Sequence, residues 1–232
     1  MIHLNMLKVE ESVMDAGILD LIVRSRPTIL EILNDRGYDV DAHVGISPEE
    51  IFLIAARTPE LLKIVAPKKG DDSLAPMERA IVYYMPNPIR GRADIEVSKL
   101  WDHEKNPDNL DPSKDEVLVI LMEPAHDIFH IQASKHWTDY KRRINFFQLK
   151  NLITNPAKHT FVPPHRKLSP EEVAELLKTG HLLSKSQLPH IKYHLDIQTR
   201  VHGLVPGDVV EITRPSETSG TATSYRICSL AF

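Results

Sequence analysis

Histidines and carboxylates are the residues of this sequence that could do chemistry, and the histidines come in two evenly spaced pairs. His126 and His130 are four residues apart, and His190 and His194 repeat that spacing. On a helix this spacing places two imidazoles on one face, as a metal site requires. Neither pair contains the glutamate of a zinc hydrolase, and no third ligand accompanies it. We therefore interpret all four as surface or packing histidines and expect no metal and no cofactor.

The carboxylates are the second candidates, because a metal-dependent nuclease needs acids and a lysine that converge on one edge of a sheet. Asp94, Glu96 and Lys99 form one such group, and Asp115 and Glu116 form another. Glu96 and Lys99 are three positions apart, whereas nucleases of the PD-(D/E)xK type have a single residue between acid and lysine. We interpret these charges as solvated surface residues and keep a metal-dependent nuclease as an alternative function.

Motifs that bind phosphate or activate a nucleophile are absent from the sequence. No stretch resembles a Walker-type or GxGxxG phosphate loop, and no Gly-x-Ser-x-Gly turn presents a serine. The sequence therefore predicts a protein that has no catalytic residues of its own.

Two basic loops could contact a phosphate backbone, because long cationic side chains reach a ligand without burying their charge. They contain Lys68 with Lys69, and Arg90 with Arg92; solubilising surface charge is the alternative interpretation. Residues 1–150 carry 19 Lys and Arg against 25 Asp and Glu, a net charge of −6, and residues 151–232 carry 9 against 7, a net charge of +2. Neither half is strongly basic, so we expect a free-standing DNA-binding module, a further alternative, to bind DNA weakly.

Composition is typical of a globular, intracellular protein. Of the 232 residues, 42% are hydrophobic and 26% are charged. No run approaches the roughly 18 apolar residues of a membrane span, and no secretory signal pattern opens the sequence. The single cysteine, Cys228, excludes an internal disulfide and a thiolate-rich zinc cluster, which fits a reducing compartment.

Hydrophobic periodicity and capping signals predict three helices near the N-terminus. They span residues 27–37, 47–57 and 58–65, and a loop follows at residues 68–79. Pro27 falls in the first turn of the first helix, where proline is tolerated. Ser47 and Glu50 form a capping box at the start of the second helix.

The middle of the chain predicts a sheet. Residues 80–85 and 117–122 are apolar and β-branched, as in buried strands, and we expect them to pair in one sheet. Residues 95–101 supply at most a short third strand between them. A helix is expected at residues 127–143, with three cations near its C-terminal end, where they suit the helix dipole. Helices and strands mixed in this way predict an α+β fold.

A domain boundary is expected at residues 151–158, where Asn155-Pro156 interrupts the pattern and the charge balance changes sign. It divides the chain into domains of residues 1–154 and 155–232. A capping box of Ser169 and Glu172 begins the main helix of the second domain. Its other expected elements are an extended segment at 159–162, a short helix at 196–202, and strands at 208–214 and 224–230.

The loop expected between those last two strands, residues 215–223, is longer than a tight hairpin needs. It mixes a proline, an acid, hydroxyls and a glycine. A long loop spends conformational freedom that a shorter turn would save, which suggests that it docks into a partner. A floppy hairpin tip is the alternative, and the residues alone favour neither.

The C-terminal third resembles a known family, the shared fifth subunit of eukaryotic nuclear RNA polymerases and its shorter archaeal equivalent. Blocks of residues in a fixed order over roughly 70 positions carry the resemblance. They are residues 159–163, His165, 168–169, 187–189, Ile191, Asp196, Arg200, 203–204, Gly207, 209–210, Ile212, 214–218, Gly220 and 225–226.

A fainter likeness covers residues 26–38, which resemble the start of the eukaryotic subunit's jaw domain, a domain that archaeal members lack. Residues 68–79 and 86–114 do not follow the family pattern, and Glu123-Pro124-Ala125-His126 replaces the expected Thr-Pro-Ser-Ala-like turn. This divergence leaves open a polymerase encoded by a large DNA virus. The location would be the nucleus for a cellular protein and the host cytoplasm or virion for a viral one.

The resemblance implies a non-catalytic subunit, because the active-site magnesium and its aspartates belong to another chain. The C-terminal domain would dock on the largest polymerase subunit near a small shared subunit, and the N-terminal domain would form part of the lower jaw near downstream double-stranded DNA, contacting it weakly. It implies no membrane partner and no homo-oligomer. The residues it implies for partner binding are Pro163, His165, Leu188, Pro189, Arg200, Arg214, Pro215, Ser216, Glu217, Thr218, Gly220, Tyr225 and Arg226, and the DNA-contact candidates are Lys68, Lys69, Arg90 and Arg92.

Overall fold

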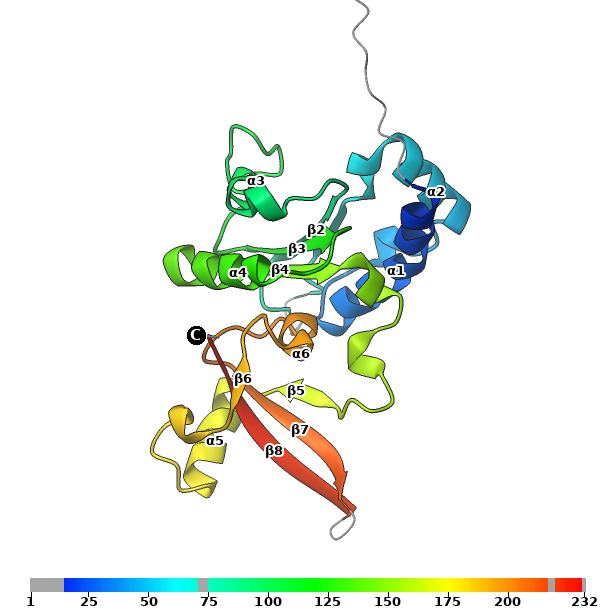
Figure 1. Ribbon diagram of the computed structural model, residues 1–232. Helices are drawn as coiled ribbons and strands as arrows, with labels where there is room; N and C mark the ends of the chain where they lie inside the picture. Colours follow the sequence, from blue (N-terminus) through cyan, green and yellow to red (C-terminus); the bar gives the residue numbers. More distant parts are fainter. Residues whose placement is uncertain (1–14, 71–74, 217–219, 231–232) are drawn as a thin grey trace, which may run out of the picture.

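The computed structural model describes residues 15–70, 75–216 and 220–230, which form two four-stranded sheets and the helices packed on them (Figure 1). The first sheet has the order β1-β2-β3-β4, with β2, β3 and β4 parallel and β1 antiparallel to β2. Its strands are β1 (Ile64–Pro67), β2 (Arg79–Met85), β3 (Asp115–Leu121) and β4 (Arg143–Gln148). The mixed helices and sheets confirm the α+β class.

Helices cover both faces of the first sheet, and the two-residue alternation of its strands decides which core each side chain joins. Leu118 and Ile120 of β3 pack towards α1 (Ala16–Asp35) and α2 (Pro48–Arg57). Val117 and Val119 pack on the opposite side with α3 (Ala93–Leu100) and α4 (Asp127–Tyr140). The chain must cross over between parallel strands, and here helices form these connections. Because β3 is buried on both faces, it is apolar over most of its length.

The second sheet has the order β5-β7-β8-β6. Its strands are β5 (His165–Lys167), β6 (His190–Lys192), β7 (Val209–Ser216) and β8 (Gly220–Ser229), accompanied by α5 (Pro170–Thr179) and α6 (Ile197–Val201). Val210 and Cys228 join the same core as α3 and α4, so one hydrophobic cluster runs from the first sheet into the second. The domain boundary after residue 154 remains a prediction. Within the described ranges, no helix has the length and apolar composition needed to cross a membrane.

Local signals in the sequence predicted several elements correctly. Both capping boxes are present: Glu50 N donates to Ser47 Oγ at 3.2 Å, and Glu172 N donates to Ser169 Oγ at 3.2 Å. β2 and β3 pair in one sheet as expected. The short helix predicted at 196–202 is α6, whose N-cap Asp196 accepts from the amide of Gln198.

The prediction that the first helix begins at Pro27 is wrong. α1 starts at Ala16 after the N-cap Asp15, and Pro27 lies inside it. A proline within a helix removes one backbone hydrogen bond and costs about 3 kcal/mol in isolation. Ile22 and Ile29, on either side of it, are buried, and their packing keeps the helix continuous.

Five further elements differ from expectation. Residues 64–67 form strand β1 and residues 93–100 form helix α3, the reverse of the predicted types. The helix expected to reach residue 143 ends at Tyr140, because Lys141 adopts a left-handed conformation with φ of 56°. β4 follows at once, and β6 was not predicted. β1, α3, β4 and β6 are short, so their neighbours rather than their own periodicity decide their form.

The segment from β6 to α6 covers the outer edge of the first sheet. β4 is an edge strand, and its Phe146 amide donates to His194 Nε2 at 2.9 Å. The Phe146 carbonyl accepts from Arg200 Nη1 at 2.8 Å. An uncovered edge strand would present these backbone groups unpaired. Side chains from the β6–α6 segment therefore pair backbone groups of β4, which has no further strand beside it among the described residues.

A buried guanidinium links three distant segments. Arg36, directly after α1, forms an ion pair with Glu116 of β3 and donates to the carbonyls of Arg200 and Val201 at the end of α6. Tyr38 Oη donates to Glu116 Oε2 at 2.7 Å. Burial lowers the pKa of Arg36 to about 10 and raises that of Tyr38 to about 12.

Gly203 gives this guanidinium its room. Its φ is +60°, and a Cβ at this position would lie 3.3 Å from Arg36 Cζ and Nε. A side chain would therefore be strained by the backbone and would also crowd the ion pair. Gly203 belongs to one of the residue blocks that carry the family resemblance, and the fold of the chain itself explains why a glycine is needed there.

His130 of α4 and His194, which follows β6, also meet. His194 Nε2 accepts the Phe146 amide, so the proton of the neutral ring is on Nδ1, which donates to His130 Nδ1 at 2.8 Å. Burial, and then the nearby charge of Arg200, lowers the pKa of both histidines, with Asp127 opposing this at His130. The contact joins one member of each sequence pair, not the two members of either pair.

Removing one side of the buried ion pair should strongly destabilise the protein. We expect Glu116→Gln to lower the free energy of unfolding by about 3–5 kcal/mol, because it leaves Arg36 charged and buried. Urea denaturation of the full chain at neutral pH measures this. The control is Asp20→Asn, which removes the exposed partner of Arg24 and should cost less than about 1 kcal/mol. Equal, small losses in both variants would contradict the assigned role.

The contact between His130 and His194 should make stability fall in mild acid. Their pKa values are depressed in the folded protein, so their contribution is fully present above about pH 6.5, the ordinary histidine value, and is lost as pH falls below it. Each adds a slope of up to about 1.4 kcal/mol per pH unit. Urea denaturation between pH 7.5 and pH 5 should show a shallower slope for His194→Gln. His103→Gln, at an exposed turn, should keep the wild-type slope; identical slopes in all three proteins would refute this assignment.

Candidate functional site

The second sheet ends in a long β-hairpin that projects from the molecule (Figure 1). β7 and β8 stay paired from Val209↔Ile227 to Ser216↔Gly220. The expected loop at 215–223 is therefore wrong over most of its length, since residues 215–216 and 220–223 belong to the strands. Pairing extends outwards from the buried base, and Thr221 and Thr223 have the β-branched side chains that strands favour.

The predicted partner-binding residues are distributed unevenly over this hairpin and its surroundings. Side chains of Pro189, Arg214, Pro215 and Arg226 are exposed, as is the backbone of Gly220. Those of Pro163, His165, Ser216 and Tyr225 are half-buried. Glu217 and Thr218 lie outside the described residues. The exposed members therefore gather on the hairpin and on the loop before β6.

Two of the predicted residues lie inside the protein. Leu188 belongs to a small core with Val173 and Val209. Arg200 is 8% exposed and bonds the edge of β4, and burial lowers its pKa to about 10. Neither side chain is on the surface in this structure, so each supports the sheet and the domain contact from within.

Gly220 and Tyr225 also have internal roles. Gly220 has φ of +71°, a conformation that glycine adopts without a Cβ clash, at the point where β8 begins. Tyr225 Oη donates to Glu211 Oε1 on the neighbouring strand at 3.4 Å. The family-like block at the hairpin therefore includes residues that shape it as well as residues that it exposes.

Two apolar side chains stand out on this domain and were not predicted as site residues. Phe161 is 88% exposed before β5, and Leu183 is 93% exposed after α5. Large apolar side chains this exposed mark interaction surfaces when they lie near one another or near a docking element. The signal in the sequence was an apolar residue in a polar, aperiodic loop, which periodicity does not detect.

The two basic loops lie at opposite edges of the first sheet. Lys68 and Lys69 follow β1 and adjoin the start of β2, since Lys68 N donates to the carbonyl of Glu78. Arg90 and Arg92 follow the end of β2. Seven residues of β2 separate the two edges, which is roughly 20 Å at about 3.3 Å per residue. The structure does not bring the two pairs together.

The carboxyl edge of the sheet organises the Arg90 loop. Glu123, in the turn after β3, accepts hydrogen bonds from the amides of Ile89 and Arg90 at 2.6 and 3.0 Å. The side chains of Arg90 and Arg92 are exposed and form no ion pair with any described residue. This loop therefore presents two free cations on a fixed backbone.

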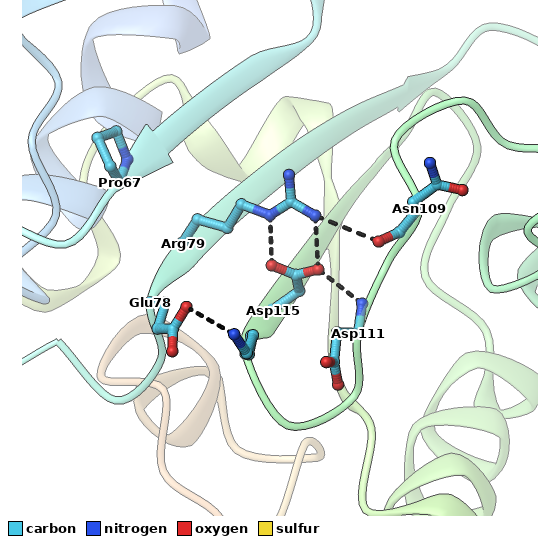
Figure 2. A pocket seen from close by; sticks show the side chains of 7 residues that line it. Pro67, Glu78, Arg79, Asn109, Asp111 and Asp115 are labelled. Atoms are coloured by element: carbon cyan, nitrogen blue, oxygen red, sulfur yellow. Dashed lines mark hydrogen bonds and ion pairs between the residues drawn. The ribbon is translucent and has the colours of Figure 1, made fainter.

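A hollow of about 430 Å³ lies at the other edge, near the starts of β2 and β3 (Figure 2). Arg79 donates from Nε and Nη2 to the two Asp115 oxygens at 2.5 and 2.8 Å, and Asp115 also accepts the Asp111 amide. The hydrogen bond to Asp115 raises the pKa of Arg79. Glu78 and Lys114 pair across the rim at 3.6 Å. These charges are paired with one another and hold the loop before β3.

The acids weighed for a nuclease are occupied in the same way. Asp115 is held by Arg79, and Glu116 by Arg36 and Tyr38. Asp94 pairs with Lys135, and Glu96 with Lys99. Within residues 15–70, 75–216 and 220–230, no group of three or more His, Cys, Asp or Glu side chains could hold a metal ion. The geometry lends no support to the nuclease alternative.

Comparisons with known proteins identify relatives of this chain. Residues 154–228 match the family model described as RNA polymerase Rpb5, C-terminal domain. The chain is 30% identical over 212 residues to DNA-directed RNA polymerases I, II, and III subunit rpabc1 of Dictyostelium discoideum, covering 90% of this chain and 98% of that one. The RPABC1 subunits of Caenorhabditis briggsae and Caenorhabditis elegans are each 41% identical over 87 residues, 38% of this chain and 40% of theirs.

All of these relatives are subunits of multisubunit, DNA-directed RNA polymerases. The match to the Dictyostelium subunit runs over nearly the whole of both chains, so it includes the N-terminal domain as well as the C-terminal one. The chain belongs to the Rpb5 family. The resemblance identified from the residue blocks is thereby confirmed.

Proposed function

We propose that the chain is a non-catalytic subunit of a DNA-dependent RNA polymerase, which docks through its C-terminal domain on the largest subunit, beside a small shared subunit. Its N-terminal domain would form part of the lower jaw near downstream DNA. The names of its relatives describe subunits common to polymerases I, II and III, and all come from eukaryotes. We therefore propose a nuclear location, and a viral origin remains the alternative.

The exposed outer half of the hairpin is the observation that carries the docking proposal. Arg214 and Pro215 project into solvent on paired strands, so their positions are set before any partner binds. A preorganised element loses little conformational freedom on binding. Phe161 and Leu183, exposed on the same domain, offer the apolar contacts that anchor protein interfaces.

The role of this surface is positional. The exposed residues offer arginines, prolines and apolar groups, which suit protein contacts better than chemistry on a substrate. We infer that the chain contributes stability to the assembly and a fixed place for the N-terminal domain, and that it contributes no catalytic residue.

Charge reversal on the hairpin should weaken assembly. In a tagged full-length chain, we expect Arg214→Glu to lower recovery of the largest polymerase subunit at least about tenfold, which corresponds to about 1.4 kcal/mol of binding free energy. Quantitative co-purification measures the ratio. Arg24→Glu, an exposed arginine on α1, is the matched control and should co-purify normally. Circular dichroism should show that both variants are folded. If both then recover the same amount of the largest subunit, the hairpin is not part of the interface.

The DNA contact of the jaw is assigned to Arg90 and Arg92, because they are exposed, unpaired among described residues and carried on a backbone held by Glu123. In the assembled polymerase, charge reversal of both should weaken binding of downstream duplex and flatten its dependence on salt, because two phosphate contacts are lost. Reversal of Lys68 and Lys69, at the opposite edge, should leave both quantities unchanged. If reversal of Lys68 and Lys69 weakens DNA binding and reversal of Arg90 and Arg92 does not, the DNA contact lies at the lysines instead.

A further inference from the structure

Residues 44–61 include α2 and lie at the end of the molecule opposite the β7–β8 hairpin (Figure 1), and several of their apolar side chains are exposed. These side chains, here called the α2 surface, are those of Val44, Phe52, Leu53 and Leu61, whose exposed fractions are 62%, 41%, 50% and 66%. They come from one continuous stretch of 18 positions. Four exposed apolar side chains within 18 positions make this segment a candidate for binding.

The geometry of α2 presents these side chains outwards. α2 buries Ile51 and Ala55 in the core that it shares with α1. Phe52 and Leu53 lie on its exposed side, three and four positions after Glu49, so these three occupy one face. The other two members of the set, Val44 and Leu61, lie in the segments before and after α2.

The flanking segments are firmly placed. Thr58 ends α2 and begins η2 (Pro59–Leu62), so Leu61 follows the C-terminal end of the helix directly. Val44 ends η1 (Asp41–His43), shortly before the N-cap of α2. The His43 ring forms a hydrogen bond with the carbonyl of Val65 in β1 at 3.1 Å, which ties η1 to the first sheet.

Acids flank the apolar side chains along the sequence. Residues 39–62 contain five acids and one arginine, a net charge of −4. Asp41, Glu49 and Glu60 are exposed and form no ion pair with any residue that the structure describes. Unpaired acids beside exposed apolar groups favour a ligand that brings both apolar contacts and positive charge.

We propose that the α2 surface binds a basic amphipathic helix of another protein. α2 has ten residues and is about 15 Å long at about 1.5 Å per residue, enough to contact two to three turns of a partner helix. The partner's apolar side would lie on Phe52 and Leu53, and its lysines or arginines would face Glu49 and Glu60. A second copy of this chain fits poorly, since a symmetric contact would oppose like charges.

This binding is distinct from docking on the polymerase. The α2 surface and the projecting hairpin lie at opposite ends of the protein (Figure 1), so one can be occupied while the other is engaged. The surface would recruit a further protein to the assembled enzyme.

A synthetic peptide tests the proposal on the full-length chain. The probe is an amphipathic helix of about 14 residues, about four turns, with leucine on one side and lysine on the other. In NMR titrations of isotope-labelled protein, its binding should shift amide signals within residues 44–61. The same peptide with glutamate in place of lysine should not bind.

Variants separate the apolar contribution from the electrostatic one. Leu53→Asp adds negative charge, yet it should weaken binding of the lysine peptide at least tenfold, because it removes apolar contact. Joint replacement of Glu49 and Glu60 by lysine should weaken it similarly. Ile131→Asp, on the outer side of α4 with 58% exposure, is the matched control and should bind as the wild type does.

Three results would overturn the proposal. One is shifts that lie outside residues 44–61, and another is unchanged affinity of Leu53→Asp. The third is a dimer in sedimentation that Leu53→Asp abolishes, which would make the surface a contact between copies. Leu61→Asp serves as a second variant if Leu53→Asp unfolds. Co-purification of the largest polymerase subunit should be unaffected by either, so this test fails or succeeds independently of the docking proposal.

Discussion

The arrangement of the whole protein depends on one buried guanidinium, that of Arg36. It neutralises Glu116 on the first sheet and donates hydrogen bonds to the carbonyls of Arg200 and Val201 in the last turn of α6, where the regular hydrogen bonds of the helix end. Burying charge is unfavourable unless every group finds its partner, so only one placement of the two halves satisfies all of them. Gly203 leaves the space that this placement needs.

The covered edge of β4 reinforces the same arrangement. His194 and Arg200 bond the amide and carbonyl of Phe146, groups that an extra strand would otherwise pair. The two halves are therefore joined by hydrogen bonds from side chains to the β4 backbone and by a common hydrophobic core, as well as by the hydrogen bonds of Arg36. The β7–β8 hairpin would therefore keep a fixed position relative to the Arg90 loop and the α2 surface. A subunit that acts by holding other parts of an assembly in place needs such rigidity.

Local structure was largely predictable where a few neighbouring residues decide it. A serine three positions before a glutamate can form a capping box with no help from the rest of the chain, and both boxes are present. The apolar runs of β2 and β3 also indicate burial directly. β1, β4 and β6 have at most six residues, and α3 has eight, so their types depended on contacts that no short window contains.

The sequence by itself determined the family, the fold class and the local caps, because these rest on residue order and short-range bonding. Only the tertiary structure decided which charges are structural. Arg36 and Arg200 look like surface residues along the chain, yet the partners of Arg36 are 80 and 164 positions away. A charge can be buried only where distant segments converge to bond it, and that convergence is a property of the folded chain.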